Sequence, residues 1–441
     1  MPRSIYIETY GCQMNLADTE IINGILNEQG YELATDPEHA DAVFMNTCAI
    51  REHAEQRIYG RLSNFAHLKK RNPRMVFGIL GCMAERLRKD LFERNSIIDI
   101  VCGPDEYRRL PALIDEALLG EQGVRTQLSR VETYDDIVPL RTEGLSAWIS
   151  VMRGCDKFCT YCVVPFTRGR ERSRSLHGVV SEARELFDRG FREVTLLGQN
   201  VNSYRDGDHD FAALLAAVSS VDACLRVRFT TSHPQDMSDA LIDTIAAHEN
   251  ICNYIHLPFQ SGSDRILDLM NRSYTREHYL DLIWRIRERI PTVALSTDII
   301  AGFPTETEEE HLMTLSLLEE VRFDSAFMFK YSPREKTRAW SMGDDIQDAV
   351  KGRRLEEIID VQRRISYEIN QTRIGKMERI LIEGASKRSE EEWMGRTDTN
   401  KSVIIPESNI SPGSYADVRI VAATSATLFG ETPTPVAVRA A

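Results

Sequence analysis

The feature that most restricts the fold of this chain is a repeated alternation of short apolar runs with amphipathic helical stretches. In the first part of the chain, the apolar runs predict four strands, at 4–8, 42–46, 75–80 and 98–102. The stretches after them predict helices, at about 18–29, 51–71, 84–94 and 111–119. Because a helix between two strands makes a crossover connection, this pattern predicts a parallel sheet with helices on both faces.

A second strand–helix series begins near residue 146 and has six apolar runs, at 147–152, 193–197, 225–229, 253–257, 294–302 and 324–331. Helical stretches such as 176–189 and 275–289 separate them, which predicts a partial (β/α)6 barrel with its chemistry at the carboxyl-terminal mouth. A charged helical stretch at 346–373 precedes short strands that predict a small five-stranded barrel. We therefore expect an α/β chain divided into four parts, 1–120, a connector at 121–145, 146–373 and 374–441.

The chain has nine cysteines, and an odd number spread over 441 residues does not suit a disulfide framework. No apolar run approaches the ~20 residues of a membrane span. The N-terminus lacks the apolar core and cleavage site of a signal peptide. We therefore expect a cytoplasmic protein without membrane association, in which thiols stay reduced. The cysteines are then either metal ligands or buried thiols.

Cys12, Cys48 and Cys82 each follow one predicted strand of the first domain. Ligands of open parallel sheets bind beyond the carboxyl ends of the strands, so we expect these three thiols to meet at one edge as metal ligands. The alternative is that they are core residues, which would more often fall inside an element. Three further cysteines lie in or near predicted elements and are interpreted as buried thiols: Cys102, Cys224 and Cys252.

Cys155, Cys159 and Cys162 have the most specific spacing in the sequence, C-x3-C-x2-C, directly after the first barrel strand. Three thiolates on a short loop suit three irons of a [4Fe–4S] cluster, which leaves the fourth iron open for a small molecule. A zinc site is one alternative, but it needs a fourth ligand, and the nearest histidine, His177, lacks the required spacing. A ferredoxin-type carrier is another, but it supplies four cysteines per cluster.

This motif at the start of a β/α barrel resembles the radical S-adenosylmethionine (SAM) superfamily, and nearly the whole chain resembles its methylthiotransferase family. Three N-terminal motifs carry the resemblance: YGCQMN (10–15), NTCAIRE (46–52) and GCMAER (81–86). Four barrel motifs extend it: RGCDKFCTYCVVPFTRGRERSR (153–174), LLGQNVNSY (196–204), HLPFQSGS (256–263) and TDIIAGFPTETEEE (297–310). The C-terminal barrel resembles the RNA-binding TRAM domain, and QMN (13–15), NTCAIRE and LLGQNVNSY resemble the MiaB type of the family.

The resemblance implies an enzyme that uses SAM and two [4Fe–4S] clusters, with all six motif cysteines as catalytic and metal-binding residues. The C-x3-C-x2-C cysteines would hold the cluster that cleaves SAM to a 5′-deoxyadenosyl radical. The three N-terminal cysteines would hold a second cluster that carries the sulfur, which another SAM methylates. The implied reaction converts N6-isopentenyladenosine beside the tRNA anticodon to its 2-methylthio derivative.

Two other functions stay open at this point. In the same enzyme class, the substrate is threonylcarbamoyladenosine in tRNA or an aspartate of a ribosomal protein. In a different class, the chain is an iron–sulfur RNA-binding or electron-transfer protein without turnover, although the open iron position argues against this.

Polar side chains that follow the barrel strands are candidates for contacts with SAM. They are Gln199, Asn200, Gln260, Ser261 and Asp298. Capping of the strand-to-helix loops is the alternative role for these side chains. In the same region, His256 is interpreted as a structural histidine rather than as a ligand.

The formal net charge of −13 argues weakly against a nucleic-acid partner, but two basic runs flank the cysteine motifs. Residues 51–94 hold eleven Lys or Arg against five Asp or Glu, a net charge of +6. The second run holds Arg168, Arg170, Arg172 and Arg174 against Glu171, and three of these, Arg168, Arg170 and Arg174, are candidates for tRNA phosphates or the SAM carboxylate. A solvated surface is the alternative for both runs. We expect a monomer whose partners are the tRNA anticodon loop and an electron donor such as flavodoxin or ferredoxin.

Overall fold

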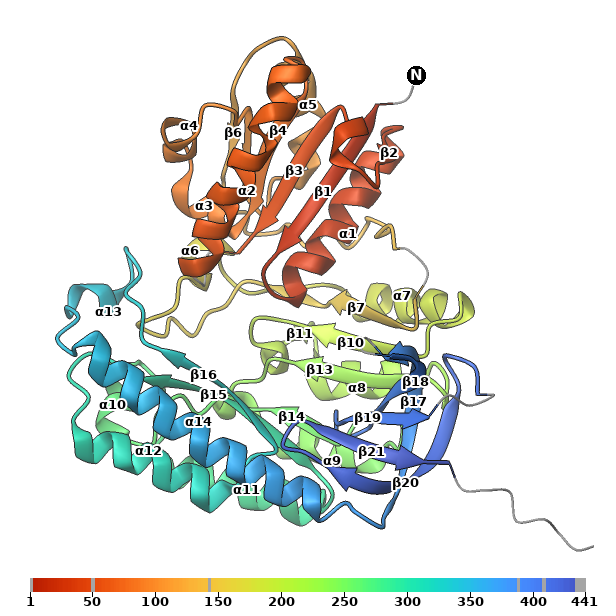
Figure 1. Cartoon of the computed structure of the whole chain (residues 1–441), viewed down its shortest axis with the longest axis vertical. Helices are drawn as coiled ribbons and strands as arrows, with labels where there is room; N and C mark the ends of the chain where they lie inside the picture. The colour runs from red at the N-terminus through yellow and green to blue at the C-terminus, as the bar shows by residue number, and fades with distance from the viewer. Residues whose placement is uncertain (1–2, 49–51, 142–143, 387–388, 407–409, 433–441) are drawn as a thin grey trace, which may run out of the picture.

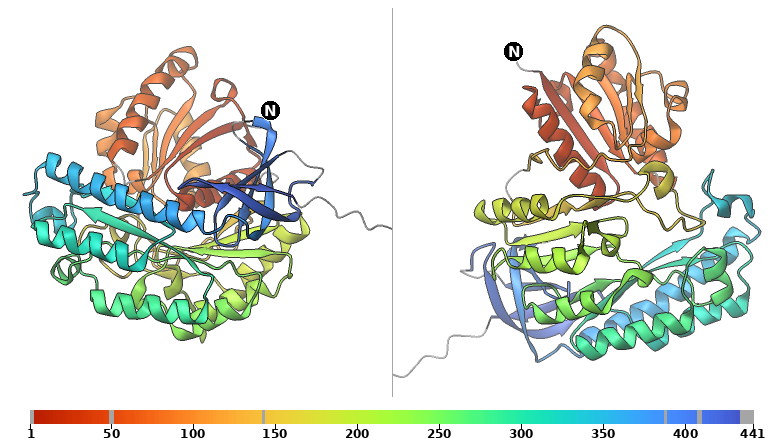
Figure 2. Two further views of the ribbon diagram at one scale, coloured as in Figure 1. Left: turned by 60° about the horizontal axis from the view of Figure 1, so that its bottom comes forward. Right: turned by 180° about the vertical axis from the view of Figure 1, so that it is seen from behind.

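The computed structural model describes residues 3–48, 52–141, 144–386, 389–406 and 410–432. Figure 1 shows an N-terminal sheet domain above a β/α barrel, with a small C-terminal barrel beside the lower part of the β/α barrel. The two views of Figure 2 show the same arrangement from other sides. Three residues of the NTCAIRE motif, at 49–51, lie outside the described residues, and so does Arg51 of the basic run.

The N-terminal domain is a six-stranded parallel sheet in the order β2-β1-β3-β4-β5-β6. Its strands are β1 (Ser4–Tyr10), β2 (Glu32–Leu33), β3 (Ala42–Thr47), β4 (Val76–Gly81), β5 (Ile100–Cys102) and β6 (Gly123–Arg125). Its helices are α1 (Gln13–Glu28), α2 (Glu52–Arg71), α3 (Cys82–Leu87), α4 (Asp90–Arg94) and α5 (Leu110–Leu118). The central strands β3 and β4 are buried along their whole length, as their continuous apolar runs require.

Both faces of this sheet are covered, which confirms the predicted layers. The apolar sides of α1 and α5 form one core with the sheet, and those of α2, α3 and α4 form the other. The helix expected at 84–94 is divided, because Arg88 adopts a positive φ of 52° and ends α3. The two-residue β2 was not predicted, and β6 lies in the stretch expected to be a connector, since both strands are too short for a recognisable period.

The second domain contains the six predicted barrel strands: β7 (Ser146–Ser150), β10 (Glu193–Leu197), β13 (Arg226–Thr230), β14 (Tyr254–His256), β15 (Ala294–Ala301) and β16 (Ser325–Lys330). Short strands beside them are β8 (Met152–Arg153), β9 (Arg172–Ser173), β11 (Arg205–Asp206) and β12 (His209–Asp210). Two parallel sheets, β13-β10-β7 and β14-β15-β16, join through a bridge between Val227 and Ile251. No pairing among the described residues joins β7 to β16, so the six strands form an open arc.

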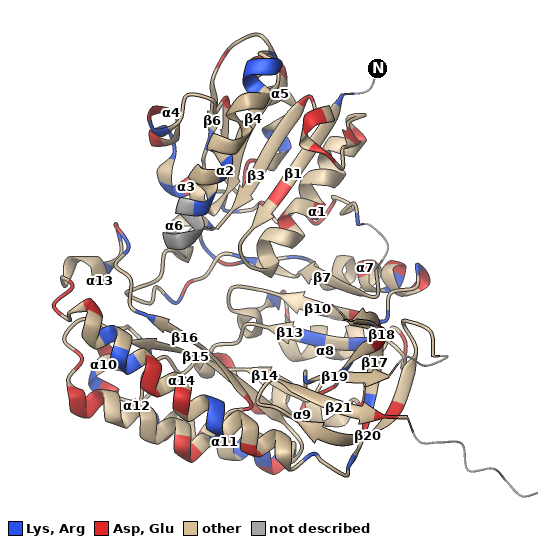
Figure 3. Ribbon diagram, viewed as in Figure 1, with Lys and Arg blue, Asp and Glu red and all other residues tan. Residues whose placement is uncertain are grey.

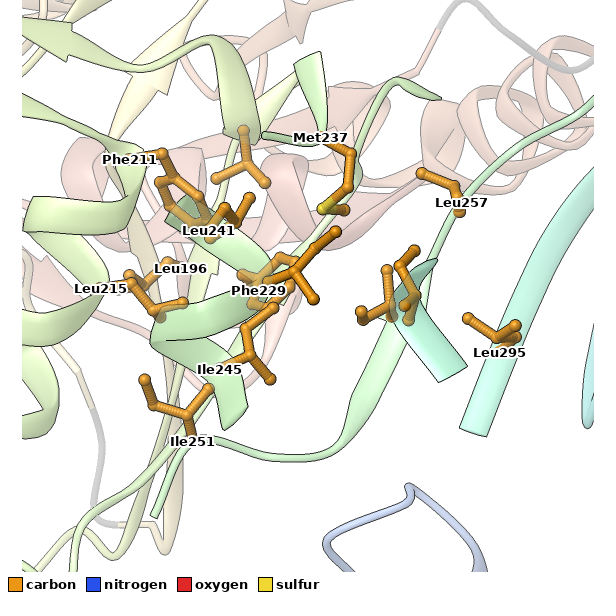
Figure 4. Packing of buried hydrophobic residues seen from close by; sticks show 14 of the residues in the cluster. Leu196, Phe211, Leu215, Phe229, Met237, Leu241, Ile245, Ile251, Leu257 and Leu295 are labelled. Atoms are coloured by element: carbon orange, nitrogen blue, oxygen red, sulfur yellow. The ribbon is translucent and has the colours of Figure 1, made fainter. Parts of the chain in front are cut away.

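The short helix α6 (Val164–Thr167) packs against α3 of the N-terminal domain, and α13 (Arg338–Ser341) shares a separate small apolar cluster with α10 (Asp264–Leu269). The longer helices cover the outside of this arc: α7 (Leu176–Asp188), α8 (Phe211–Ser219), α9 (Asp239–Ala247), α11 (Arg276–Arg289), α12 (Glu308–Val321) and α14 (Asp348–Gln371). The core lies between these helices and the outward face of the strands. Figure 4 shows part of it, where Phe229 of β13 lies among Leu241 and Ile245 of α9 and Phe211 of α8.

The C-terminal domain is a closed five-stranded barrel in the order β17-β18-β19-β21-β20, as predicted. Its strands are β17 (Met377–Ser386), β18 (Ser389–Thr397), β19 (Ser402–Pro406), β20 (Tyr415–Ala423) and β21 (Thr427–Glu431). Arg228, in the middle of β13, donates to the carbonyl of Thr397 over 2.7 Å, and Lys401 pairs at 2.6 Å with Asp324, which directly precedes β16. These contacts fix the small barrel at the amino-terminal end of the arc, so the carboxyl-terminal mouth is left to the N-terminal domain.

The N-terminal domain meets the arc through the carboxyl ends of its strands, which point toward the arc in Figure 1. Met14 and Ala17 of α1 form a small apolar cluster with Leu197 of β10. Cys82 of α3 packs against Val163, which immediately precedes α6. The carboxyl ends of one parallel sheet therefore lie against the first loop of the arc.

The acidic net charge is distributed over mixed surfaces. Figure 3 shows Lys and Arg interspersed with Asp and Glu along the outer helices of the arc, including α14. Pairs one helical turn apart, such as Arg353 with Glu357 and Arg364 with Glu368, neutralise part of this charge. No helix within the described ranges is long and apolar enough to cross a membrane.

Candidate functional site

The three N-terminal cysteines lie at one edge of the first sheet, as the sequence predicts. Cys12 immediately precedes α1, Cys48 immediately follows β3, and Cys82 begins α3 directly after β4. Strands β1, β3 and β4 are neighbours in the sheet, so their carboxyl ends bring the three thiols to the same edge of the sheet.

The turn around Gly11 holds two of these thiols close together. Gly11 has a φ of 143°, and a Cβ there would lie 2.7 Å from the Cβ of Cys48. A hydrogen bond from Cys48 holds the pKa of Cys12 below its ordinary value. Asn15 fixes the turn, because its Nδ2 donates to the carbonyl of Thr47 over 3.3 Å. Cys12 and Cys48 therefore lie within hydrogen-bond reach of each other.

The second set of cysteines lies on the loop between β8 and α6, at the mouth of the arc. The amide of Cys155 donates to the carbonyl of Gly169 over 3.1 Å, and the amide of Cys162 to the carbonyl of Cys159 over 3.0 Å. Burial raises the pKa of Cys155 to about 12, and burial with the neighbouring Cys159 raises that of Cys162. These thiols must therefore lose protons when they bind a metal, so binding is coupled to proton release.

Each set of cysteines has an arginine against one thiol. Arg272, after α10, donates from Nη1 to Cys159 Sγ at 3.5 Å. Arg168, after α6, donates from Nε to Cys82 Sγ at 3.2 Å. Both arginines are less than a tenth exposed. Burial raises the pKa of Cys82, and the guanidinium of Arg168 opposes this rise, which favours the thiolate form that metal ligation requires.

The mouth of the arc is lined by buried polar atoms that have no hydrogen-bond partner among the described residues. They are Asn200 Oδ1, Thr231 Oγ1, Ser232 Oγ, His233 Nε2 and Gln260 Oε1. All of them follow β10, β13 or β14 at the carboxyl end. Buried polar groups normally have partners, so this ring of atoms fits a polar ligand such as SAM beside the C-x3-C-x2-C loop.

Gln199 and Asn200 both touch that loop or its support. Gln199 Oε1 accepts from the amide of Gly154 at 2.5 Å, directly before Cys155. Asn200 Nδ2 donates to Asp236 over 2.7 Å, and Asp236 pairs with Lys157 of the loop at 2.8 Å. Gln199 therefore supports the loop, while Asn200 keeps its oxygen available for a ligand.

Gln260 and Ser261 are buried after β14, and only the first keeps a free polar atom. Gln260 has a φ of 67° and leaves Oε1 without a partner. Ser261 Oγ accepts from the amide of Ser263, which is the loop-capping role.

Asp298 lies 3.4 Å from His256 Nε2, and His256 Nδ1 lies 2.8 Å from Ser296 Oγ. His256 has partners at both ring nitrogens, as expected of a structural histidine.

His233 contributes to the mouth in a way that its sequence position alone does not indicate. Burial, together with the positive charges of Arg272 and Lys157, lowers the pKa of His233 to about 2, so the ring is neutral. The amide of Gln235 donates to Nδ1 at 3.3 Å, which leaves the proton on Nε2. His233 therefore offers an N–H donor that has no partner within the described ranges.

The expectation that Arg168 and Arg174 meet tRNA phosphates or the SAM carboxylate is wrong, and so is the solvated alternative. Arg168 is 3% exposed and lies against Asp18 and Cys82. Arg174 is 7% exposed and pairs with Glu182 at 2.6 Å. Neither side chain reaches the surface, because the segment passes between the two domains; only Arg170 is exposed, paired with Asp156.

The remaining cysteines divide into two groups. Cys102 and Cys252 are buried, as expected, and burial raises the pKa of both thiols. Cys224 is exposed, which corrects its interpretation as a buried thiol. It lies in the turn before β13, where its amide donates to Asp222 Oδ1 at 2.7 Å.

Three segments of the chain match known families. Residues 4–103 match the family described as "Uncharacterized protein family UPF0004", residues 149–318 match the radical SAM superfamily, and residues 371–432 match the TRAM domain. The N-terminal cysteines thus lie in the first segment and the C-x3-C-x2-C loop in the second.

Among solved structures, TsrM from Kitasatospora setae, a radical S-adenosylmethionine methyltransferase with cobalamin and a [4Fe-4S] cluster bound, superposes with a TM-score of 0.60. It is 16% identical and the match covers 77% of each chain. This likeness shows that the fold is that of radical SAM enzymes.

Two relatives match almost end to end. The tRNA-2-methylthio-N(6)-dimethylallyladenosine synthase of Chloroherpeton thalassium is 53% identical over 429 residues, which cover 97% of this chain and 95% of the relative. The protein of the same name from Prosthecochloris aestuarii is 50% identical over 438 residues, which cover 99% of both chains. With this identity over its whole length, the chain belongs to the family of the tRNA-2-methylthio-N(6)-dimethylallyladenosine synthases.

Proposed function

We propose that this chain is a sulfur-inserting radical SAM transferase that converts N6-isopentenyladenosine beside the tRNA anticodon to 2-methylthio-N6-isopentenyladenosine. The curated relatives that match end to end carry the name of this activity. Threonylcarbamoyladenosine and a ribosomal aspartate are not favoured as substrates, since the names of these relatives specify the dimethylallyl base.

The observation that carries the proposal is the presence of two thiol triads at facing ends of two domains. One triad lies at the carboxyl edge of the first sheet, and the other lies at the mouth of the arc. The Arg168 contact with Cys82 joins the segment after the second triad to the first triad directly. A single base held between the domains would therefore be within reach of both.

We assign each triad one [4Fe–4S] cluster, with the unpartnered polar atoms of the mouth around SAM. When bound, these groups supply a 5′-deoxyadenosyl radical and the sulfur for transfer. The chain's own residues hold them in place: Gln199 fixes the loop through Gly154, and Arg272 holds Cys159. Asn200 and Gln260 each offer a hydrogen-bond acceptor to the bound SAM, and His233 offers a donor.

The tRNA partner follows from the same proposal. Exposed cations of the basic run, Arg57 and Lys70 on α2 with Arg74 and Lys89 nearby, are the candidates for phosphate contacts. The small barrel, with its nearly balanced charge, would position the tRNA rather than supply most of the affinity. A base inside a stacked loop hides its ring carbon, so the adenosine must be extruded into the mouth.

The compartment, the oligomeric state and the electron donor stay predictions. We infer a cytoplasmic monomer that receives electrons from a flavodoxin- or ferredoxin-like donor. The domain boundaries at 120, 145 and 373 also stay predictions, and limited proteolysis is the direct way to test them.

The experiment that tests the function is mass spectrometry of nucleosides from tRNA incubated anaerobically with the reconstituted protein, SAM and a reductant. One tRNA pool carries isopentenyladenosine and the other carries threonylcarbamoyladenosine. We expect the methylthio product from the first pool only. Product from the second pool alone would keep the chemistry and overturn the substrate.

Two single-cysteine variants separate the roles of the triads in the same assay. Cys159→Ala should abolish both SAM cleavage and the methylthio product. Cys48→Ala should retain reductive SAM cleavage and lose the product, because only the first triad is damaged. Methylthio product from Cys48→Ala would contradict the assignment of the sulfur to the first sheet.

A further inference from the structure

A buried network of charges lies between the two domains and connects the two triads. Asp18 of α1, which is fully buried, pairs with Arg153 and with Arg168, at 2.8 Å each. Asp105 pairs with Arg172 at 2.9 Å and lies 3.7 Å from Arg153. Because arginine stays charged in proteins, the three guanidinium groups leave an excess of positive charge over the two carboxylates.

This network is costly for stability alone. Removing a charge from water costs several kcal/mol, and apolar residues of similar size often stabilise a fold equally well. Although burial alone would raise the pKa of Asp18, Arg153 and Arg168 hold it below the ordinary value, so the carboxylate stays ionised. A network of this kind therefore points to a purpose beyond cohesion of the domains.

Arg168 is the member of the network that touches a cysteine ligand. Its Nε donates to Cys82 Sγ at 3.2 Å, its Nη2 donates to Asp18, and its Nη1 is buried with no hydrogen-bond partner in the described part of the chain. It lies six residues after Cys162 in the sequence, so one short segment carries a ligand of one triad and a charge against the other. Asp18 holds the guanidinium in this position.

We propose that Arg168 is a positioning residue whose fixed positive charge raises the reduction potential of the cluster held by Cys12, Cys48 and Cys82. The inference rests on the proposed function, because it takes that triad to hold a [4Fe–4S] cluster. Reduction adds a negative charge to a site that three thiolates already make negative. Net charge and hydrogen bonds to sulfur set cluster potentials, so a guanidinium at Cys82 favours the reduced state.

The test uses the full-length chain with Cys155, Cys159 and Cys162 changed to alanine, so that only the N-terminal cluster is present. The reconstituted protein is analysed for iron, and its reduction is followed by electron paramagnetic resonance at a series of fixed potentials. In Arg168→Gln, we expect the ratio of reduced to oxidised cluster at the parental midpoint to fall at least threefold. Arg168→Lys keeps the positive charge, so its ratio of reduced to oxidised cluster should regain at least half of what Arg168→Gln loses.

Arg172→Gln is the matched control. Arg172 is also buried and also paired with an aspartate of the same network, but its contacts with the described residues include no cysteine. Its loss should leave the midpoint unchanged. A purely structural role of the network would make the two glutamine variants behave alike.

Each result decides the proposal. An unchanged midpoint in Arg168→Gln, an equal shift in Arg172→Gln, or no recovery with lysine would overturn it. If Arg168→Gln takes up no cluster while Arg172→Gln is fully loaded, Arg168 is needed to hold the cluster rather than to set its potential, which would overturn the proposal. If Arg168→Gln and Arg172→Gln both fail to take up a cluster, the network has only a structural role and the proposal is overturned. A parental protein that binds no iron would instead refute the cluster assignment, and the inference with it.

Discussion

Gly154→Ala gives the sharpest test of how the loop before Cys155 is built. Gly154 has a φ of 81°, and a Cβ at this position would collide with the carbonyl of Arg170. The left-handed conformation alone costs a non-glycine residue about 1–2 kcal/mol. Overpacking against backbone adds about 1–3 kcal/mol, so we expect a total of about 2–5 kcal/mol concentrated on this loop.

The expected outcome is selective loss of one cluster. Two [4Fe–4S] clusters bring about eight irons per chain, and Gly154→Ala should retain about four, with SAM cleavage lost. Gly343→Ala is the matched control, because Gly343 has a similar φ of 86° with no atom within 4 Å of the added Cβ. Iron analysis and SAM cleavage are measured on both variants. Full iron content in Gly154→Ala would refute the idea that this loop requires glycine.

Three further predictions follow from single contacts. Gln199→Ala removes the acceptor of the Gly154 amide and should destabilise the loop before Cys155 by about 1 kcal/mol. Iron should then be released to a chelator faster from the second triad, and at an unchanged rate from the first. His233 is neutral in the folded protein, but in the unfolded chain it binds a proton below pH ~6.5. The free energy of unfolding should therefore fall by about 1.2 kcal/mol from pH 7 to 5.5. When His233→Asn is unfolded with denaturant at these two pH values, this part of the decrease should be absent. Arg228→Met leaves Glu193 and the Thr397 carbonyl unpaired, which should weaken the attachment of the small barrel to the arc by about 3–5 kcal/mol. Proteolysis of the segment between α14 and β17 should therefore become faster.

Much of this architecture is predictable from the sequence because it depends on local periodicity. All six strands of the arc and the five strands of the small barrel coincide with apolar runs, and each motif cysteine of the first domain follows its strand directly. The rule that ligands gather at the carboxyl ends of parallel strands then places Cys12, Cys48 and Cys82 together without knowledge of the tertiary structure.

The elements that escaped prediction are those whose identity depends on contacts distant in sequence. The two-residue β2 and three-residue β6 exist only because neighbouring strands pair with them. Arg272 carries no motif and becomes a contact of Cys159 only when the loop after α10 folds back. Cys224 is expected to be buried because it lies next to a predicted strand, but a turn exposes it.

The arginine run after Cys162 shows most clearly where sequence reasoning stops. Charged residues near a cysteine motif indicate either solvation or phosphate binding, and both interpretations assume that the side chains reach the surface. The partners that bury them, Asp18 and Asp105, are about 150 and 67 positions away and belong to the other domain. Once those carboxylates are in place, the charge of Arg168 is directed inward, at a cysteine rather than at RNA. The segment that anchors the second triad thereby becomes part of the environment of the first.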